Sequence, residues 1–451
     1  MMGRLNRDQD QLFYSFNLDD AVPGDHLVRK IAAVLDLSWV HAELAGHYSN
    51  LGRPSIDPEL MLRMLILGYV FAIRSERALV REVRVNLAYR WFCNLSIEDA
   101  VPDHSAFSRA RNERFADGDV LRLVFERVVA SCVAENLVGG EGFAVDASLI
   151  QADANRRRSV KGNEWSKDID PDTASRATRE YLATLDDAAY GTATKVTPKF
   201  VSPADPAAQW TGAKRDKAIF AYSNNYLIDV KFGIIVDVEA SRAIRQAEVE
   251  ASRRMITRTE QSFGIKPDWL AADAAYGNAP NLNWLVNDKK IDPYVPVIDK
   301  SERNDGTFSR SHFRYDHKLD CYFCPAGCKL KSSGRPGSDD TYRYLARVSD
   351  CKGCSFKPIC CPKTPQRKVP RHIFEPARDV ARMLAKTDDH ERAGRNRRKV
   401  EMLFAHLKRI LGLNRLRLRG PKGAQNEFTL AAIAQNLRRL AKLKPQVVSA
   451  A

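Results

Sequence analysis

The feature that most restricts the fold is a run of short alternating elements between residues 142 and 298. GFAVDASLI (142–150) follows a glycine pair and is typical of a strand, and AYSNNYLIDV, KFG and IIVDVEA together predict a hairpin over 221–240. The pattern then predicts a helix over 243–259, a strand within 266–277, a short helix over 279–286 and a strand over 291–298. This order of elements indicates a mixed α/β sheet.

The segment before the sheet is predicted to be a compact helical unit over 55–137. Asp57 is placed to cap a helix that starts at Pro58, and Ser75 to cap a second helix that runs to about Asn94. Two further helices are expected, one capped by Asp103 or Ser105 and one over 121–137. A glycine pair at 139–140 then breaks the chain.

The rest of the chain divides into three kinds of segment. Residues 155–217 are polar and are expected to be loop, and 299–375 form a charged, cysteine-rich insertion. Three helices are expected after it, to about 386, over 389–411 and over 423–443. We therefore predict a helical DNA-binding or dimerisation domain over 1–138, a sheet domain over 141–298, the insertion over 299–375, and a helical part over 376–445 that completes the sheet domain.

The chain is strongly basic. It has 71 Lys and Arg against 56 Asp and Glu, a formal net charge of +15, which favours a polyanionic partner such as nucleic acid or an anionic membrane surface. The longest apolar run, 60–73, is shorter than the roughly 20 residues of a membrane span and contains Arg63. The N-terminus lacks the apolar stretch of a signal peptide. We expect a cytoplasmic protein without disulfides.

Two aspartates lie in apolar surroundings within this predicted sheet. Asp146 is flanked by Val145 and Ala147, and Asp273 ends the strand that contains LAADA. A buried carboxylate is costly unless it is paired or binds a metal. Each aspartate alone is better explained as a cap at a strand end or turn, but the presence of two of them in one α/β unit weakens that explanation and favours a shared site.

A third candidate acid lies on the long helix near the C-terminus. At about 100° per residue, Arg397, Glu401, Phe404 and Lys408 fall on one face. An exposed ion pair between Arg397 and Glu401 would also explain this spacing, and would be worth only about 0.3–0.5 kcal/mol. Residues 391–420, however, hold ten basic and two acidic side chains, a net of +8. An acid within so basic a helix fits a metal ligand presented to a phosphate backbone, and Arg398, Arg415 and Arg417 are expected to bind DNA there.

These residues resemble those of DDE transposases from bacterial insertion sequences. The resemblance rests on AVDASLIQAD around Asp146, AADAAYG around Asp273 and R-x3-E-x6-K around Glu401, and extends over roughly 45–440. The N-terminal stretch RPSIDPELMLRMLILGYVFAIRSERALVREV is also similar to that family. One group of the family has the signature Y-x2-R-x3-E-x6-K, and here Gly394 stands at the tyrosine position.

The resemblance implies a ribonuclease-H-like fold and metal-dependent phosphoryl transfer. Asp146, Asp273 and Glu401 would hold Mg²⁺ or Mn²⁺, the hard cations that carboxylates prefer, and Arg397 and Lys408 would contact phosphates. The enzyme would bind terminal inverted repeats, cut DNA at transposon ends and join the 3′ ends to target DNA. A homo-oligomer on DNA, associated with the nucleoid, would follow. A nuclease of the same fold without strand transfer and an inactive DNA-binding descendant are the alternatives.

Other carboxylates lie near the three candidates. They are less suited because none ends a matching strand, although Asp229 or Asp237 would serve as a supporting or structural acid. The remaining acids of this kind are Asp153, Glu239 and Asp268.

Seven of the nine cysteines lie between 321 and 361. Cys321-x2-Cys324 and Cys351-x2-Cys354 are two pairs of the kind that binds Zn²⁺, although the 26 residues between them exceed the usual 15–20. The family resemblance favours a zinc ribbon formed by Cys324, Cys351, Cys354 and Cys360. Free thiols in a loosely packed insertion are the alternative.

The N-terminal helices are a second candidate for DNA recognition. Helices over 75–94 and 104–115 would form a helix-turn-helix that presents Arg109, Arg111 and Arg114 to DNA. An ordinary helical domain with a basic exposed face explains the same pattern.

Overall fold

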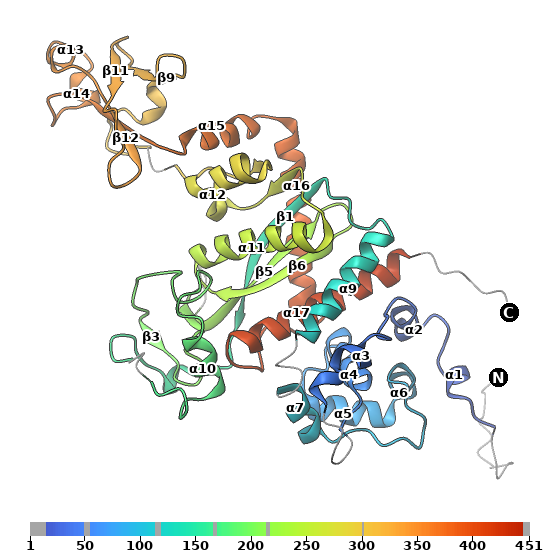
Figure 1. Ribbon diagram of the computed structural model, residues 1–451. Coiled ribbons are helices and arrows are strands. Elements are labelled where there is room, and N and C mark those ends of the chain that lie inside the picture. The colour runs from blue at the N-terminus through green and yellow to red at the C-terminus, as the bar shows by residue number, and fades with distance from the viewer. Residues whose placement is uncertain are drawn as a thin grey trace, which may run out of the picture.

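A mixed sheet lies at the centre of the computed structural model, which describes residues 15–48, 55–112, 119–165, 169–212, 217–299 and 302–444. Its strands are β1 (Gly142–Gln151), β4 (Gln209–Thr211), β5 (Ile219–Asp229), β6 (Ile234–Arg242), β7 (Trp269–Ala271) and β8 (Asp292–Tyr294). β5 is antiparallel to β1 on one edge and to β4 and β6 on the other, whereas β1, β7 and β8 are parallel neighbours. The predicted mixed sheet is therefore present (Figure 1).

Helices cover both faces of this sheet. The hydroxyl of Ser223 on β5 bonds to α11 (Arg245–Phe263), whereas Tyr226 on the same strand contacts α16 (Asp388–Arg409) and α17 (Pro421–Leu443). Side chains three residues apart on a strand point to opposite faces, so α11 lies on one face and α16 and α17 lie on the other. The short helices α12 (Ala279–Asn283) and α15 (Glu375–Leu384) pack together near β8.

The N-terminal region is helical, as predicted. Its helices are α1 (Leu18–Ala21), α2 (Leu27–Ala32), α3 (Val40–Leu44), α4 (Pro58–Val70), α5 (Glu76–Val85), α6 (Leu87–Phe92), α7 (His104–Asn112) and α9 (Val120–Ala134). Asp57 caps α4 by accepting a hydrogen bond from the Leu60 amide at 2.9 Å. The single helix expected over 75–94 is wrong, because Asn86 interrupts it and caps α6 through the Tyr89 amide.

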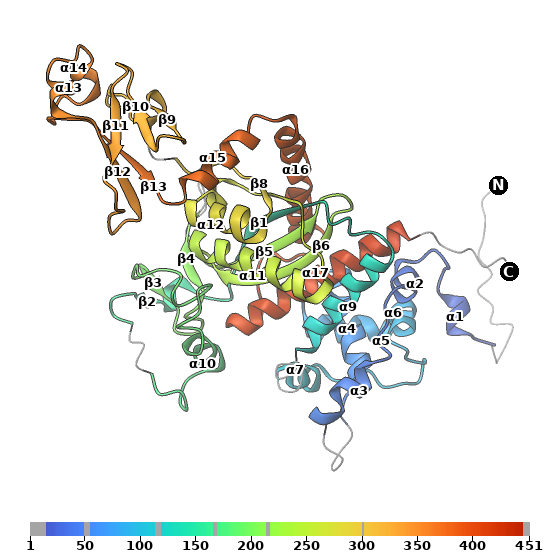
Figure 2. The same ribbon diagram turned by 45° about the horizontal axis from the view of Figure 1, so that its top comes forward.

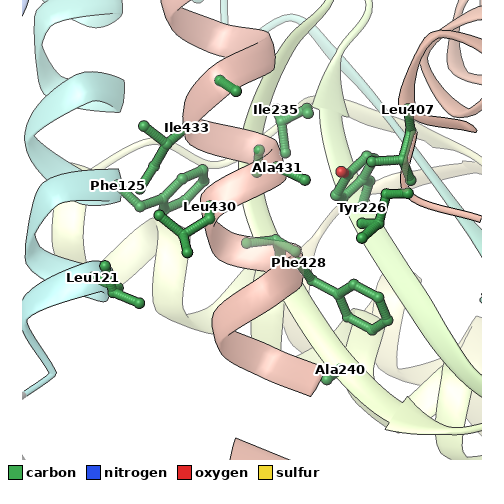
Figure 3. Packing of buried hydrophobic residues seen from close by; sticks show 14 of the residues in the cluster. Leu121, Phe125, Tyr226, Ile235, Ala240, Leu407, Phe428, Leu430, Ala431 and Ile433 are labelled. Carbon is green, nitrogen blue, oxygen red and sulfur yellow. The ribbon is translucent and has the colours of Figure 1, made fainter. Parts of the chain in front are cut away.

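The core of the molecule is continuous from the N-terminal helices to the sheet. Figure 3 shows α17 between α9 on one side and β5 and β6 on the other, and Phe125, Ile433, Phe428 and Ala240 belong to the same cluster of buried residues. α17 is suited to this place because all of its residues from Phe428 to Leu437 are buried, so it packs against its neighbours on every side. No described helix is long and apolar enough to cross a membrane.

Two segments differ from their expected form. The polar stretch 155–217 is not all loop, since it contains α10 (Arg176–Leu182), β2 (Val160–Lys161), β3 (Phe200–Val201) and β4.

The cysteine-rich segment has an antiparallel sheet in the order β13-β12-β11-β10-β9 and extends away from the N-terminal helices (Figures 1 and 2). Its elements are β9 (Arg314–Asp316), β10 (Cys321–Phe323), β11 (Lys329–Ser332), β12 (Thr341–Leu345), α13 (Val348–Lys352), α14 (Lys357–Cys360) and β13 (Lys368–His372).

Candidate active site

The register of the sheet places Asp146 and Asp273 at the same level. β1 and β7 are parallel, and their last paired residues are Ala144 and Ala271. Each aspartate follows its paired alanine by two residues. Asp273 lies two residues past the end of β7 in extended backbone, so equal offsets from the paired alanines bring the two carboxylates near each other, and the charge of Asp273 acts on Asp146.

α16 brings the third candidate acid to these aspartates. The Arg397 guanidinium lies between two carboxylates, with Nη1 at 3.8 Å from Asp146 Oδ2 and Nη2 at 3.6 Å from Glu401 Oε1. The side chain of Glu401 is 59% exposed and that of Asp146 is 21% exposed. The predicted ion pair on α16 is thus real, but it also reaches the sheet and connects two of the three candidate acids.

Aromatic stacking fixes the position of α16 on the sheet. The rings of Phe404 on α16 and Tyr226 on β5 are stacked, with centroids 5.0 Å apart and planes 6° from parallel. Tyr226 lies directly opposite Asp146 in the antiparallel β1–β5 pair, and its hydroxyl donates to Gln435 Oε1 of α17 at 3.0 Å. Phe404 follows Glu401 by about one helical turn, so this stack holds the glutamate near Asp146 of β1.

The carboxylates influence one another electrostatically. Burial, and then the nearby carboxylates of Asp273 and Glu401, raise the pKa of Asp146, while the hydrogen bond from the Ala147 amide and the charge of Arg397 oppose that shift. Asp273 accepts a hydrogen bond from the Ala275 amide at 2.8 Å and caps a short 3₁₀ turn. The capping role expected as an alternative is therefore present, and it leaves Asp273 close enough to repel Asp146.

A fourth acid, which the sequence interpretation missed, shares this environment. Glu248 lies in the first turn of α11 and accepts a hydrogen bond from Ser223 Oγ at 2.6 Å. Burial, and then repulsion from Asp273 and Asp146, raise its pKa. The buried Tyr276 hydroxyl, which has no hydrogen-bond partner among the described residues, is close enough to Glu248, Asp146 and Asp273 to feel their charges. The available signal was an acid near the start of the helix predicted over 243–259.

The three candidate acids offer the type of ligand atom that a hard divalent cation prefers. Asp146, Asp273 and Glu401 offer carboxylate oxygens, the ligands that Mg²⁺ and Mn²⁺ prefer. Their mutual repulsion is the kind that a bound cation relieves. Within the described ranges, however, no three Asp, Glu, His or Cys side chains are grouped closely enough to hold an ion. The guanidinium of Arg397 supplies part of the compensating positive charge in this arrangement.

The basic residues predicted around Glu401 have different surroundings. Arg398 and Arg417 are exposed. Arg415 forms an ion pair with Asp153 at 2.8 Å, and Arg419 forms another with the same carboxylate at 2.9 Å. Lys408 is partly buried, and burial lowers the pKa of its ammonium.

Two of the alternative acids have structural partners. Asp237 is fully buried and forms ion pairs with Arg122 of α9 and Arg258 of α11. Asp229 accepts hydrogen bonds from the amides of Gly139 and Lys231 and so holds the turns at the ends of β1 and β5. These contacts explain both acids without any role at the candidate site.

The cysteines lie in two neighbouring groups. Cys324 Sγ accepts a hydrogen bond from the Cys328 amide at 3.3 Å, and burial, followed by Cys324, Asp350 and Cys354, raises the pKa of the Cys328 thiol. Burial and then Cys361 raise the pKa of both Cys351 and Cys360. The four cysteines favoured as zinc ligands are thus divided between the two groups.

The arginines of the N-terminal helices are only partly available for DNA. Arg109 is exposed, whereas Arg111 forms an ion pair with Glu76 of α5 and is mostly buried. This pair gives Arg111 a structural role between α5 and α7. Arg114, the third predicted contact, lies outside the described residues.

Two segments of the chain, one near each end, match models of transposase families. Residues 16–113 match the family model "Transposase domain (DUF772)", and residues 323–441, which include Glu401, match "Transposase DDE domain". Asp146 and Asp273 lie outside both matches. No curated protein matches the chain. A cryo-EM structure of a piggyBac transposase synaptic complex with hairpin DNA aligns at a TM-score of 0.32 and 8% identity, over 92% of this chain and 78% of that chain, a likeness too low to carry an argument. The two family matches support a DDE transposase.

Proposed function

We propose that this protein is a metal-dependent DDE transposase that binds terminal inverted repeats, cuts DNA at transposon ends and joins the 3′ ends to target DNA. The observation that carries the proposal is the nearness of Asp146 on β1 to Asp273, two residues past the end of the parallel strand β7, with Glu401 of α16 linked to Asp146 through Arg397. The matches to a transposase domain and a transposase DDE domain support it independently.

The order of strands supports a ribonuclease-H-like fold for the catalytic part. Three antiparallel strands, β6, β5 and β1, are followed by the parallel strands β7 and β8 in one sheet, with helices on both faces. We propose that residues 141–298 and 376–445 together form this part, that 299–375 are an insertion in it, and that 1–138 bind or dimerise on DNA. We further propose that the protein acts as a homo-oligomer on DNA and is associated with the nucleoid.

The residues of this chain have distinct roles in the proposal. Asp146, Asp273 and Glu401 would hold Mg²⁺ or Mn²⁺, which when bound would activate the attacking oxygen and stabilise the leaving oxygen. Arg397 would turn from the carboxylates to a phosphate of the DNA, since a guanidinium binds phosphate well. Lys408 would contact a neighbouring phosphate from the same face of α16, and Arg398, Arg415 and Arg417 would bind the flanking backbone.

The decisive test is the reaction itself. We expect the purified protein to nick and join a DNA duplex that carries its own gene with the native flanks, when Mg²⁺ is present. Removal of the cation with EDTA is expected to stop the reaction, and added Mn²⁺ to restore it. Products would be resolved on a denaturing gel. Cleavage without joined products would favour a nuclease, and DNA binding without cleavage an inactive descendant.

We also propose that the cysteine-rich segment binds structural zinc through Cys324, Cys351, Cys354 and Cys360. The grouping of the cysteines and the amide hydrogen bond to Cys324 support it, because such bonds stabilise thiolates. Freshly purified, reduced protein is expected to contain about one zinc ion per chain by elemental analysis. Protein without zinc would exclude this proposal, but it would not contradict the proposed transposase activity.

A further inference from the structure

A basic groove lies between α2, α16 and α17, outside the candidate active site. Its volume is about 890 Å³, and no Asp or Glu is among the residues that line it. We call it the α2–α16–α17 groove. Six cationic side chains line it: Lys30, Lys399, Arg438, Arg439, Lys442 and Lys444.

The positive charge of this groove is largely uncompensated. Lys444 forms an ion pair with Glu135 at 2.7 Å. Lys399, Arg438 and Arg439 donate instead to the backbone carbonyls of Val230, Val70 and Phe232, which fixes their positions without cancelling their charge. Within the described part of the chain, the side chains of Lys30 and Lys442 form neither a hydrogen bond nor an ion pair. Burial, and then the charge of Arg438, lower the pKa of His406 in the wall of the groove.

The groove lies across α16 from the candidate active site. With Arg397 at 0° and about 100° per residue, Glu401 falls at about 40°, whereas Lys399 and His406 of the groove fall at about 200° and 180°. The two surfaces are therefore separated by one helix, roughly 10 Å. Arg398, exposed and at about 100°, lies on the ridge between them. Positive charge thus continues from the site over the exposed side of α16 into the groove.

We infer that the α2–α16–α17 groove binds the phosphate backbone of duplex DNA that extends from the candidate active site across α16. This inference rests on the proposed function and adds a surface that extends beyond residues 391–420, to Lys30 of α2 and the cationic side chains of α17. A groove with six cations and no acid suits a chain of phosphates, and its connection to the catalytic helix favours DNA over other polyanions. Lys30, from the N-terminal helices, would join the two ends of the chain on one DNA segment.

Salt dependence of DNA binding tests this inference. Each phosphate contact to B-DNA contributes about −0.9 to the slope of log K against log[salt]. We expect the double variant Lys30→Gln, Lys442→Gln to reduce the magnitude of the slope by roughly 2, and to weaken binding about tenfold or more at 0.1 M salt. The measurement is fluorescence anisotropy with a labelled duplex that carries the native flanks. The matched control, Lys318→Gln with Lys386→Gln, removes the same charge from exposed positions outside the groove and is expected to leave the slope unchanged.

The outcomes separate this inference from the proposed function. If the wild-type protein does not bind the duplex, the proposed function fails. If it does bind and both double variants keep the wild-type slope, the groove is not a DNA surface. Loss of binding to vesicles of anionic phospholipid, with the DNA slope unchanged, would overturn the inference in favour of a membrane. Equal melting temperatures for the three proteins would show that the variants are folded.

Discussion

Asp146→Asn is expected to lower the rate of Mg²⁺-dependent cleavage by at least about 10³-fold while the protein stays folded. A bound cation supplies several kcal/mol of transition-state stabilisation, and each 1.36 kcal/mol corresponds to a factor of ten in rate. An amide in place of the Asp146 carboxylate removes a charged ligand from the centre of the proposed site. Single-turnover cleavage of the duplex with native flanks measures the effect, and Glu401→Gln should behave in the same way.

The stability of this variant is part of the same prediction. The pKa of Asp146 is raised in the folded protein, first by burial and then by Asp273 and Glu401, so its ionised form is less favourable there than in the unfolded chain. A neutral side chain removes that cost above the unfolded pKa, and the melting temperature at pH 7 should stay equal or rise. A variant that is inactive because it unfolds would contradict the assignment.

A matched control separates charge loss in general from loss at this site. Asp268 is exposed and directly precedes β7, only five residues before Asp273. Asp268→Asn removes the same charge and is expected to keep cleavage within about twofold of the wild type, since surface substitutions of this kind have small effects. Wild-type rates for Asp146→Asn and Glu401→Gln would exclude these two acids from the catalytic site.

The sequence predicted the elements that local patterns define. Asp57 and Pro58 marked the start of α4, and the hairpin of β5 and β6 followed from alternating residues around Gly233. Asn86 was missed as a helix break because the residues around it keep a helical pattern and only its side-chain cap separates α5 from α6. The sheet of the cysteine-rich segment was missed because its strands are three to five residues long, too short for a periodic signal.

The candidate site was predictable in its residues but not in its geometry. Asp146, Asp273 and Glu401 were chosen from apolar context and motif order, whereas their common level depends on the pairing of Ala144 with Ala271, which joins segments far apart in the chain. The bridging position of Arg397 and the approach of Glu248 from α11 likewise depend on how helices pack on the sheet. Local propensity carries no information on such tertiary contacts.

Asp237→Asn is expected to have the opposite effect to Asp146→Asn, because the same change on another strand of this sheet breaks a structural ion-pair network. Asp237 is fully buried on β6 and binds Arg122 of α9 and Arg258 of α11, the latter at 2.9 Å. Loss of one partner of a buried pair costs about 3–5 kcal/mol when the other charge is left unpaired. Here Arg122 keeps Glu126 and Arg258 keeps Glu239, so we expect a loss near the lower end of that range. Urea denaturation followed by circular dichroism measures this fall in the free energy of unfolding.

The surface acid Asp153 provides a control for the effect of burial on the ion pairs of Asp237. Asp153 also binds two arginines, Arg415 and Arg419, but its side chain is 31% exposed and theirs are 53% and 50% exposed. Exposed pairs are worth about 0–1 kcal/mol each, so Asp153→Asn should change stability little. A loss below about 1 kcal/mol for Asp237→Asn would show that α9 and α11 do not depend on this network. A loss of the expected size for Asp237→Asn, together with slow cleavage by a folded Asp146→Asn variant, would show that the sheet retains charge for two separable reasons, the attachment of helices at Asp237 and catalysis at Asp146.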